Sequence, residues 1–183
     1  MTEVAEYLQN LTLSPECSLK FKAVRTPSSM HTFKELLDLM RPEGKFVVTT
    51  VDTIFEIDYF KQYIDFFEKT PKDIDGVMGV TTYIDDEKPL YIETEGHHRI
   101  VAYKDQPFPG VKYVSAGIYG LETSAIPVLQ DCISSGVNRM RNFQRNLVEK
   151  GLNLDAYDLG KVLDVDHLAD IEKANAFLNK REK

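Results

Sequence analysis

Two kinds of hydrophobic pattern alternate along the chain. Continuous or alternating apolar runs, typical of strands, are separated by segments in which apolar residues recur at helical spacing. The pattern predicts strands at residues 19–24, 46–51, 76–83, 90–103 and 111–121, and a short pair of strands that ends near residue 164. It predicts helices around residues 4–11, 33–40, 59–67, 124–134, 138–150 and 171–177.

This alternation predicts the α/β class, with one domain over residues 1–183. The run at 46–51 is interpreted as a strand buried on both faces, as the strands of parallel sheets are. A turn around Gly96, between two apolar runs, indicates a β-hairpin inserted into the pattern. The composition, 43% hydrophobic and 28% charged over 183 residues, is sufficient for one substantial core.

Net charge and cysteine content exclude several classes of protein. The formal net charge of −7 argues against binding to nucleic acid or to an anionic membrane, since both require a cationic face. Cys17 and Cys132 are too few for a disulfide framework or a zinc site. The sequence shows no cationic leader and no apolar run of membrane-spanning length, so we expect a cytoplasmic protein.

Acidic residues follow two of the predicted strands. Asp52 comes directly after the strand at 46–51, and Asp164 and Asp166 end another apolar run far along the chain. Strands of an open parallel sheet deliver their C-terminal ends to one crevice, where carboxylates can hold a hard cation against a phosphate-bearing ligand. Two other roles remain open: Asp52 as a turn or N-cap residue, and one of Asp164 and Asp166 as the cap of the closing helix.

Four segments carry a family resemblance: FVVTTVDTIF at 46–55, IVAYK at 100–104, YVSAGIY at 113–119 and DVDHLADI at 164–171. They occur in the order seen in sugar-phosphate nucleotidyltransferases, which the chain resembles over most of its length. One departure is His167-Leu168, where the family has a Thr-Pro pair. The resemblance implies a Rossmann-like, mostly parallel sheet with flanking helices and the inserted hairpin. It also implies a reaction that joins a nucleoside triphosphate to a sugar or alcohol phosphate and releases pyrophosphate.

The N-terminal part of the sequence differs more strongly from that family. Members open with a strand and a glycine-rich loop, followed by a basic residue and a Lys-Pro segment, and nothing before Asp52 resembles these parts. We therefore expect an N-terminally truncated enzyme that lacks its first strand and phosphate loop. The strands at 19–24 and 46–51 would then have unpaired edges, which favour a homo-oligomer, with exchange of the first helix and strand as one arrangement.

The resemblance also implies roles for particular residues. Asp52 and Asp164 would be the catalytic carboxylates that hold Mg²⁺, and Asp166 would be a further metal ligand. The remaining matches fall into two sets: Lys104, Ser115, Gly117 and Tyr119 for the sugar phosphate, and Ser28, Ser29 and His31 for the nucleotide.

Structural alternatives accompany several of these roles. Lys104 would otherwise be a solvated strand end, and Tyr119 a residue of strand packing. Ser28 or Ser29 would otherwise cap the helix that follows. These alternatives stay open at the level of the sequence.

The expected partners are thus two small molecules, a nucleoside triphosphate and a sugar phosphate. Two other functions remain open: a nucleotide-sugar-dependent glycosyltransferase, with the acidic residues 164–166 on the donor diphosphate, and a non-catalytic binding or assembly module. Other polar groups are interpreted as solvated. They are the turn His97-His98, the acidic residues 85–87, and Arg139, Arg141 and Arg145 on the wet side of a helix.

Overall fold

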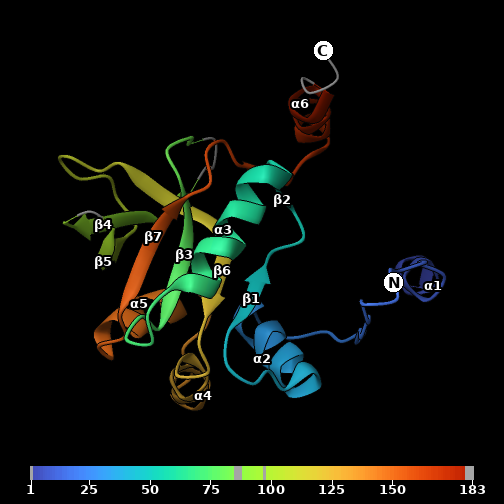
Figure 1. Ribbon diagram of the computed structural model, residues 1–183, viewed down its shortest axis with the longest axis horizontal. Coiled ribbons are helices and arrows are strands. Elements are labelled where there is room, and N and C mark those ends of the chain that lie inside the picture. The colour runs from blue at the N-terminus through green and yellow to red at the C-terminus, as the bar shows by residue number, and fades with distance from the viewer. Residues whose placement is uncertain (1, 85–87, 97, 180–183) are drawn as a thin grey trace.

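The computed structural model describes residues 2–84, 88–96 and 98–179 (Figure 1). His97 and the acidic residues 85–87, interpreted above as solvated, lie outside the described residues. The described helices are α1 (Thr2–Gln9), α2 (Ser29–Met40), α3 (Ile57–Lys69), α4 (Ala125–Ser134), α5 (Met140–Glu149) and α6 (Leu168–Leu178). The described strands are β1 (Phe46–Thr49), β2 (Thr53–Ile54), β3 (Gly76–Thr81), β4 (Tyr91–Glu95), β5 (Arg99–Lys104), β6 (Tyr113–Leu121), β7 (Leu154–Asp158) and β8 (Leu163–Asp164).

Six of these strands form a central sheet in the order β1-β6-β3-β7-β5-β4. β6 pairs antiparallel with both β1 and β3, and β3 pairs parallel with β7. β1, β3 and β7 therefore point the same way, while β6 runs against them between β1 and β3. The predicted α/β class and the hairpin, β4 with β5, are confirmed. β6 and the hairpin strand β5 both run against their neighbours, so among the described strands only β3 and β7 pair in parallel and the sheet is mixed. No periodic pattern reveals this, because periodicity carries no strand direction.

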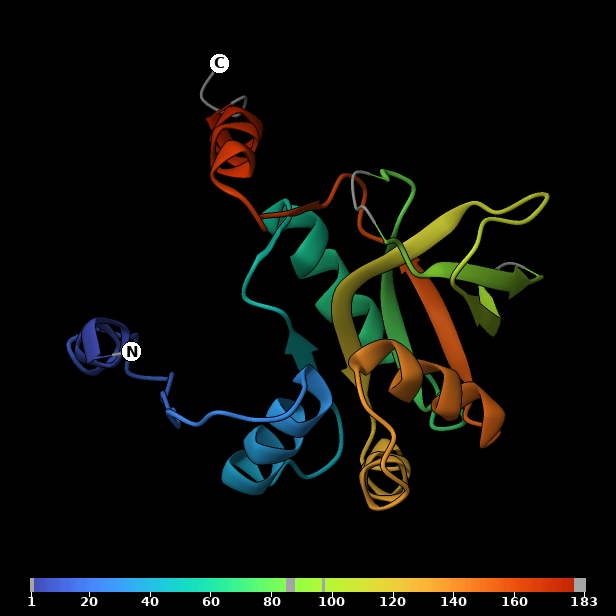
Figure 2. The same ribbon diagram turned by 180° about the vertical axis from the view of Figure 1, so that it is seen from behind.

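Helices cover both faces of this sheet (Figures 1 and 2). On one face α3 packs Tyr63 and Phe67 against the strands, and on the other α2, α4 and α5 share a larger core that includes Phe33 and Phe143. β3 lies at the centre, and all six of its residues are buried. Gly120 on β6 permits the close approach of α3, since a Cβ there would lie 2.6 Å from the Tyr63 hydroxyl. None of the described helices is long and apolar enough to cross a membrane.

Two strand predictions are wrong. Residues 19–24 form no strand, and this segment lies with α1 apart from the sheet, where Leu19, Phe21 and Val24 are exposed (Figures 1 and 2). An alternating pattern alone does not make a strand, because a strand also needs a neighbour for its ladder. β1 is half-buried rather than fully buried, because β6 is its only partner among the described strands and β1 forms the sheet edge. Association through this edge stays a prediction.

A single lysine joins the start of β1 to the end of α3. Lys45 precedes β1, and its Nζ donates to the backbone oxygens of Phe67 at 2.7 Å and Thr70 at 3.1 Å, and to the Thr70 hydroxyl at 2.9 Å. The last carbonyls of a helix lack partners within the helix and carry partial negative charge, so a cation there satisfies them. This contact fixes where β1 enters the sheet.

We expect Lys45→Ala to lower the free energy of unfolding by about 1–2 kcal/mol, because several half-buried carbonyl acceptors lose their donor. Chemical denaturation would measure the change. Lys69→Ala is the matched control, since it removes an exposed lysine from the last turn of the same helix. A control as damaging as Lys45→Ala would contradict the capping role.

Candidate functional site

A cavity of about 360 Å³ lies beside β6, between the loop after β1 and the start of α5. Six of the residues predicted from the sequence line it: Ser29, Asp52, Ser115, Gly117, Tyr119 and Asp164. Six further residues complete the wall: Thr50, Leu90, Arg139, Met140, Arg141 and Gln144. Segments that are far apart in the sequence thus meet in one polar cavity.

The two predicted carboxylates come together through a small ladder. β2 pairs antiparallel with β8, which places Thr53 opposite Asp164, and the Val165 N–H donates to the Asp52 carbonyl at 3.0 Å. The Thr53 hydroxyl donates to Asp164 Oδ1 at 3.1 Å. Asp52 and Asp164 therefore place two carboxyl groups in the lining of the cavity.

Neither carboxylate caps a helix. α3 follows Glu56 in the N-cap position, several residues after Asp52. α6 follows His167 in that position, and the His167 N–H donates to the Asp170 carboxylate at 3.0 Å. The capping alternatives for Asp52, Asp164 and Asp166 are therefore wrong.

Gly117 lets the loop that carries Asp52 lie against β6. Its φ is +72°, and a Cβ there would lie 2.8 Å from the hydroxyl oxygens of both Thr50 and Thr53. The Thr50 N–H donates to the Gly117 carbonyl at 3.1 Å, and the hydroxyls of Thr50 and Thr53 form a hydrogen bond with each other. Glycine is required here for both conformation and space.

Neutral polar groups form the floor of the cavity. The Ser115 hydroxyl donates to Gln144 Oε1 at 3.2 Å, and Gln144 is only 2% exposed. The pKa of Tyr119 is raised to about 12, mainly by burial, and the charges of Asp164 and Asp52 act in the same direction. A hydrogen bond with Ser115 acts in the opposite direction. Tyr119 is therefore a neutral hydroxyl at physiological pH.

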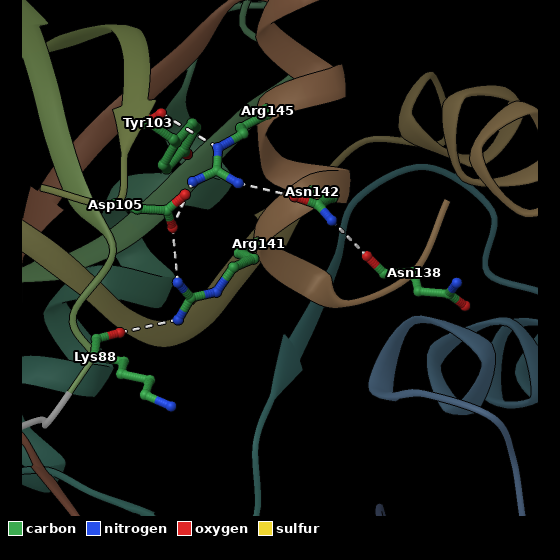
Figure 3. Close-up of polar contacts among 7 residues, drawn as sticks. All are labelled: Lys88, Tyr103, Asp105, Asn138, Arg141, Asn142 and Arg145. Carbon is green, nitrogen blue, oxygen red and sulfur yellow. Dashed lines mark hydrogen bonds and ion pairs between the residues drawn. The ribbon is translucent and has the colours of Figure 1, made fainter. Parts of the chain in front are cut away.

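Two arginines at the start of α5, Arg139 in the N-cap position and Arg141 in the first turn, line the same cavity as the carboxylates. Figure 3 shows Arg141 and Arg145 reaching from α5 to Asp105, whose Oδ1 lies 2.8 Å from Arg141 and 2.7 Å from Arg145. Arg141 also donates to the Lys88 carbonyl at 2.9 Å. The Arg145 guanidinium, followed by that of Arg141, holds the pKa of Asp105 below its usual range. These contacts fix Arg141 in the cavity wall.

The prediction of solvated arginines is therefore wrong for Arg141 and Arg145, which are half-buried and ion-paired. Arg139 is exposed but also lines the cavity. The helical pattern correctly assigned these residues to the polar side of a helix. No signal in the sequence indicated that the hairpin would bring Asp105 to that side, because the contact joins segments distant in the sequence.

The other predicted residues lie elsewhere. Lys104 pairs with Glu93 at 2.7 Å and lies over the Phe108 ring at 4.3 Å, and it is not among the cavity-lining residues. Asp166 is exposed and also outside the lining. His31 Nδ1 lies 2.9 Å from the Ser28 hydroxyl, and neither residue lines the cavity.

Ser28 and Ser29 connect α2 with the start of α5. Ser28 occupies the N-cap position of α2 but makes no side-chain capping bond there. Instead, the N–H groups of Arg139 and Met140 donate to the Ser28 and Ser29 hydroxyls, each at 3.4 Å. The two serines therefore position the arginine-bearing end of α5.

Comparison with known proteins bears on this arrangement. No family model and no curated protein sequence matches the chain. Solved structures do: an inositol-1-phosphate CTP transferase from T. maritima has a TM-score of 0.65 at 16% identity, covering 84% of this chain and 63% of that one. A Bacillus anthracis protein described as a glucose-1-phosphate thymidylyltransferase, in complex with sucrose, has a TM-score of 0.73 at 16% identity. The match covers 97% of this chain and 71% of that one. UDP-glucose pyrophosphorylase complexed with UDP-glucose has a TM-score of 0.66 at 17% identity, covering 84% of this chain and 63% of that one.

The chain has the sugar-phosphate nucleotidyltransferase fold. The resemblance seen in the sequence is thereby confirmed at the level of the fold. The chain spans 63% of the length of the CTP transferase and of the pyrophosphorylase, less than two thirds of either.

Within this nucleotidyltransferase fold, the donor set of the cavity suits magnesium. Mg²⁺ takes oxygen ligands and is commonly held by one or two carboxylates together with waters and substrate phosphates. Asp52 and Asp164 supply such a pair. Across residues 2–84, 88–96 and 98–179 there is no group of three or more His, Cys, Asp or Glu that could hold a metal by itself. The pair fits an ion completed by substrate, and the Mg²⁺ site stays a prediction.

We expect Gly117→Ala to reduce the free energy of unfolding by about 2–4 kcal/mol, because strain at positive φ adds to a clash with two threonine hydroxyls. Gly110→Ala is the control, since Gly110 has a φ of +81° but no atom within 4 Å of the place that a Cβ would occupy. Its cost should be about 1 kcal/mol. Equal losses in the two variants, measured by denaturation, would show that Gly117 is needed for its backbone conformation alone.

Proposed function

We propose that the cavity binds a sugar 1-phosphate or a related phosphate as the acceptor in a nucleotidyl transfer reaction. The observation that carries the proposal is the meeting of three kinds of group in one cavity. Asp52 and Asp164 (the acidic wall), Arg139 and Arg141 (the basic wall) and the neutral hydroxyls of Ser115 and Tyr119 all line it. The fold shared with sugar-phosphate nucleotidyltransferases supports the same reaction class.

Each wall has a role in this chemistry. An oxygen of the acceptor phosphate attacks the α-phosphorus of a nucleoside triphosphate in line, and pyrophosphate leaves. Both reactants are anions, so the guanidinium groups of Arg139 and Arg141 would lie against the acceptor phosphate and offset the repulsion. Asp52 and Asp164 would hold magnesium, which when bound screens the phosphate charges and stabilises the transition state.

This scheme keeps some of the predicted residue roles and changes others. Lys104 was expected to hold the acceptor phosphate, but its pairing with Glu93 outside the cavity leads us to assign that role to Arg141. Ser115 and Tyr119 would meet sugar hydroxyls. Asp164, rather than Asp166, would be the metal ligand of the closing segment.

Calorimetric titration with glucose, galactose and mannose 1-phosphates tests the acidic wall. The chain should bind at least one of them more tightly with magnesium than with EDTA. In Asp52→Asn and Asp164→Asn this difference should disappear, because the amide keeps the shape of the side chain but lacks the ligand charge. Asp166→Asn serves as the control and should keep the difference. Magnesium dependence that survives in the first two variants would refute the assignment.

Product analysis tests the reaction itself. With magnesium, the four nucleoside triphosphates and the same sugar phosphates, we expect the 183-residue chain to release little pyrophosphate, because its sequence carries no glycine-rich loop to hold the triphosphate. Robust release would contradict this expectation. Free nucleoside diphosphate released from a nucleotide sugar would instead indicate a glycosyltransferase.

A further inference from the structure

A buried glutamine forms part of the cavity wall. Gln144 lies on α5 one turn after Arg141, and only 2% of its surface is exposed, yet it lines the cavity. Buried polar side chains normally have hydrogen-bond partners for their donors and acceptors. The partners of Gln144 therefore indicate whether it serves the core or the cavity.

Those partners account for one end of the amide. The Ser115 hydroxyl donates to Gln144 Oε1, and no acceptor for the Nε2 group is found among the described residues. Among the described residues, only the Tyr103 hydroxyl is a fully enclosed side-chain polar atom without a hydrogen-bond partner. Nε2 has no partner among these residues either, so it is not fully enclosed. The Nε2 group therefore keeps a small exposed surface, and Gln144 lines the cavity.

The neighbours of this amide define the chemistry it would meet. Ser115 and Tyr119 contribute hydroxyls to the same lining, so Gln144 belongs to the neutral polar groups of the cavity. A second phosphate would be served better by a charged donor, because charge-assisted hydrogen bonds to phosphate are stronger. A neutral amide donor that is itself buried instead suits a hydroxyl oxygen.

We infer that Gln144 determines acceptor specificity by donating a hydrogen bond from Nε2 to a hydroxyl oxygen of the acceptor sugar. The inference rests on the proposed function, and it narrows the acceptor to a phosphate whose carbon skeleton bears hydroxyls. Ser115 fixes the amide by binding Oε1, which directs Nε2 into the cavity. Arg141, one turn earlier on the same helix, would hold the phosphate, so the recognised hydroxyl lies near the phosphate-bearing end of the sugar.

Titration of matched ligands tests the inference. The probes are the sugar 1-phosphate that binds best, its monodeoxy analogues at each ring position, and inorganic phosphate. The wild-type chain should prefer the complete sugar over one deoxy analogue by about tenfold to a hundredfold, because that analogue leaves the amide unpaired. In Gln144→Leu this preference should fall to about twofold or less, while the affinity for inorganic phosphate stays unchanged.

Two further variants separate recognition from folding. Gln144→Met keeps the length of the side chain without its amide, and it should lose the same preference while its melting temperature stays close to that of the wild type. Gln130→Leu makes the same substitution at an exposed position of α4 outside the cavity lining, and it should keep the wild-type preference.

The outcomes are distinguishable. Wild-type discrimination that persists in Gln144→Leu and Gln144→Met overturns the inference and leaves the proposed function intact. Loss of inorganic phosphate binding together with sugar binding also overturns it, since Gln144 would then maintain the cavity rather than recognise the sugar. If the wild-type chain binds neither any sugar 1-phosphate nor inorganic phosphate, the proposed function fails and the inference fails with it.

Discussion

The cavity depends on the close packing of the loop after β1 on β6, at a residue without a side chain. The hydroxyl oxygens of Thr50 and Thr53 occupy the space that a Cβ of Gly117 would need. The Thr50 N–H of the same loop donates to the Gly117 carbonyl, and its Asp52 carbonyl accepts from the N–H of Val165, directly after β8. One close contact therefore sets the position of the acidic wall relative to the strand that carries the neutral hydroxyls.

The direction of β6 makes this arrangement possible. β6 pairs with β4 near Tyr113 and with β1 near Leu121, so it crosses from the hairpin to the edge of the sheet. Side chains two positions apart lie on one face of a strand, and Ser115, Gly117 and Tyr119 accordingly all reach the cavity. A strand parallel to its neighbours would start at the other end of the sheet and present a different part of its sequence to the loop after β1.

Asp52 and Asp164 were predicted to share one site because strands of one parallel sheet end in the same crevice. Both residues do line one cavity, but a different contact brings them together: Asp164 lies on β8, which pairs with β2 in a separate two-stranded sheet too short to show periodicity. Contacts between distant segments leave no such signal in the sequence. Residues 19–24 have a strand pattern, but the existence of a neighbouring strand is a property of the tertiary structure. Arg141 was assigned to solvent because the arrival of Asp105 from the hairpin depends on how β5 meets α5.

The distribution of charge in the cavity would orient an anionic ligand as well as attract it. A protein with a net charge of −7 repels anions as a whole, so a phosphate ligand depends on local cations. Asp105 is shared by two arginines, and its lowered pKa keeps it ionised, so this cluster of three side chains retains positive charge beside the cavity. The opposite wall, with Asp52 and Asp164, would accept a second phosphate only through a bound cation. A phosphate that reaches both the arginines and a cation held by Asp52 and Asp164 would therefore be bound between the two walls. There its oxygen could lie in line with the α-phosphorus of a metal-bound nucleotide, which is the geometry that nucleotidyl transfer requires.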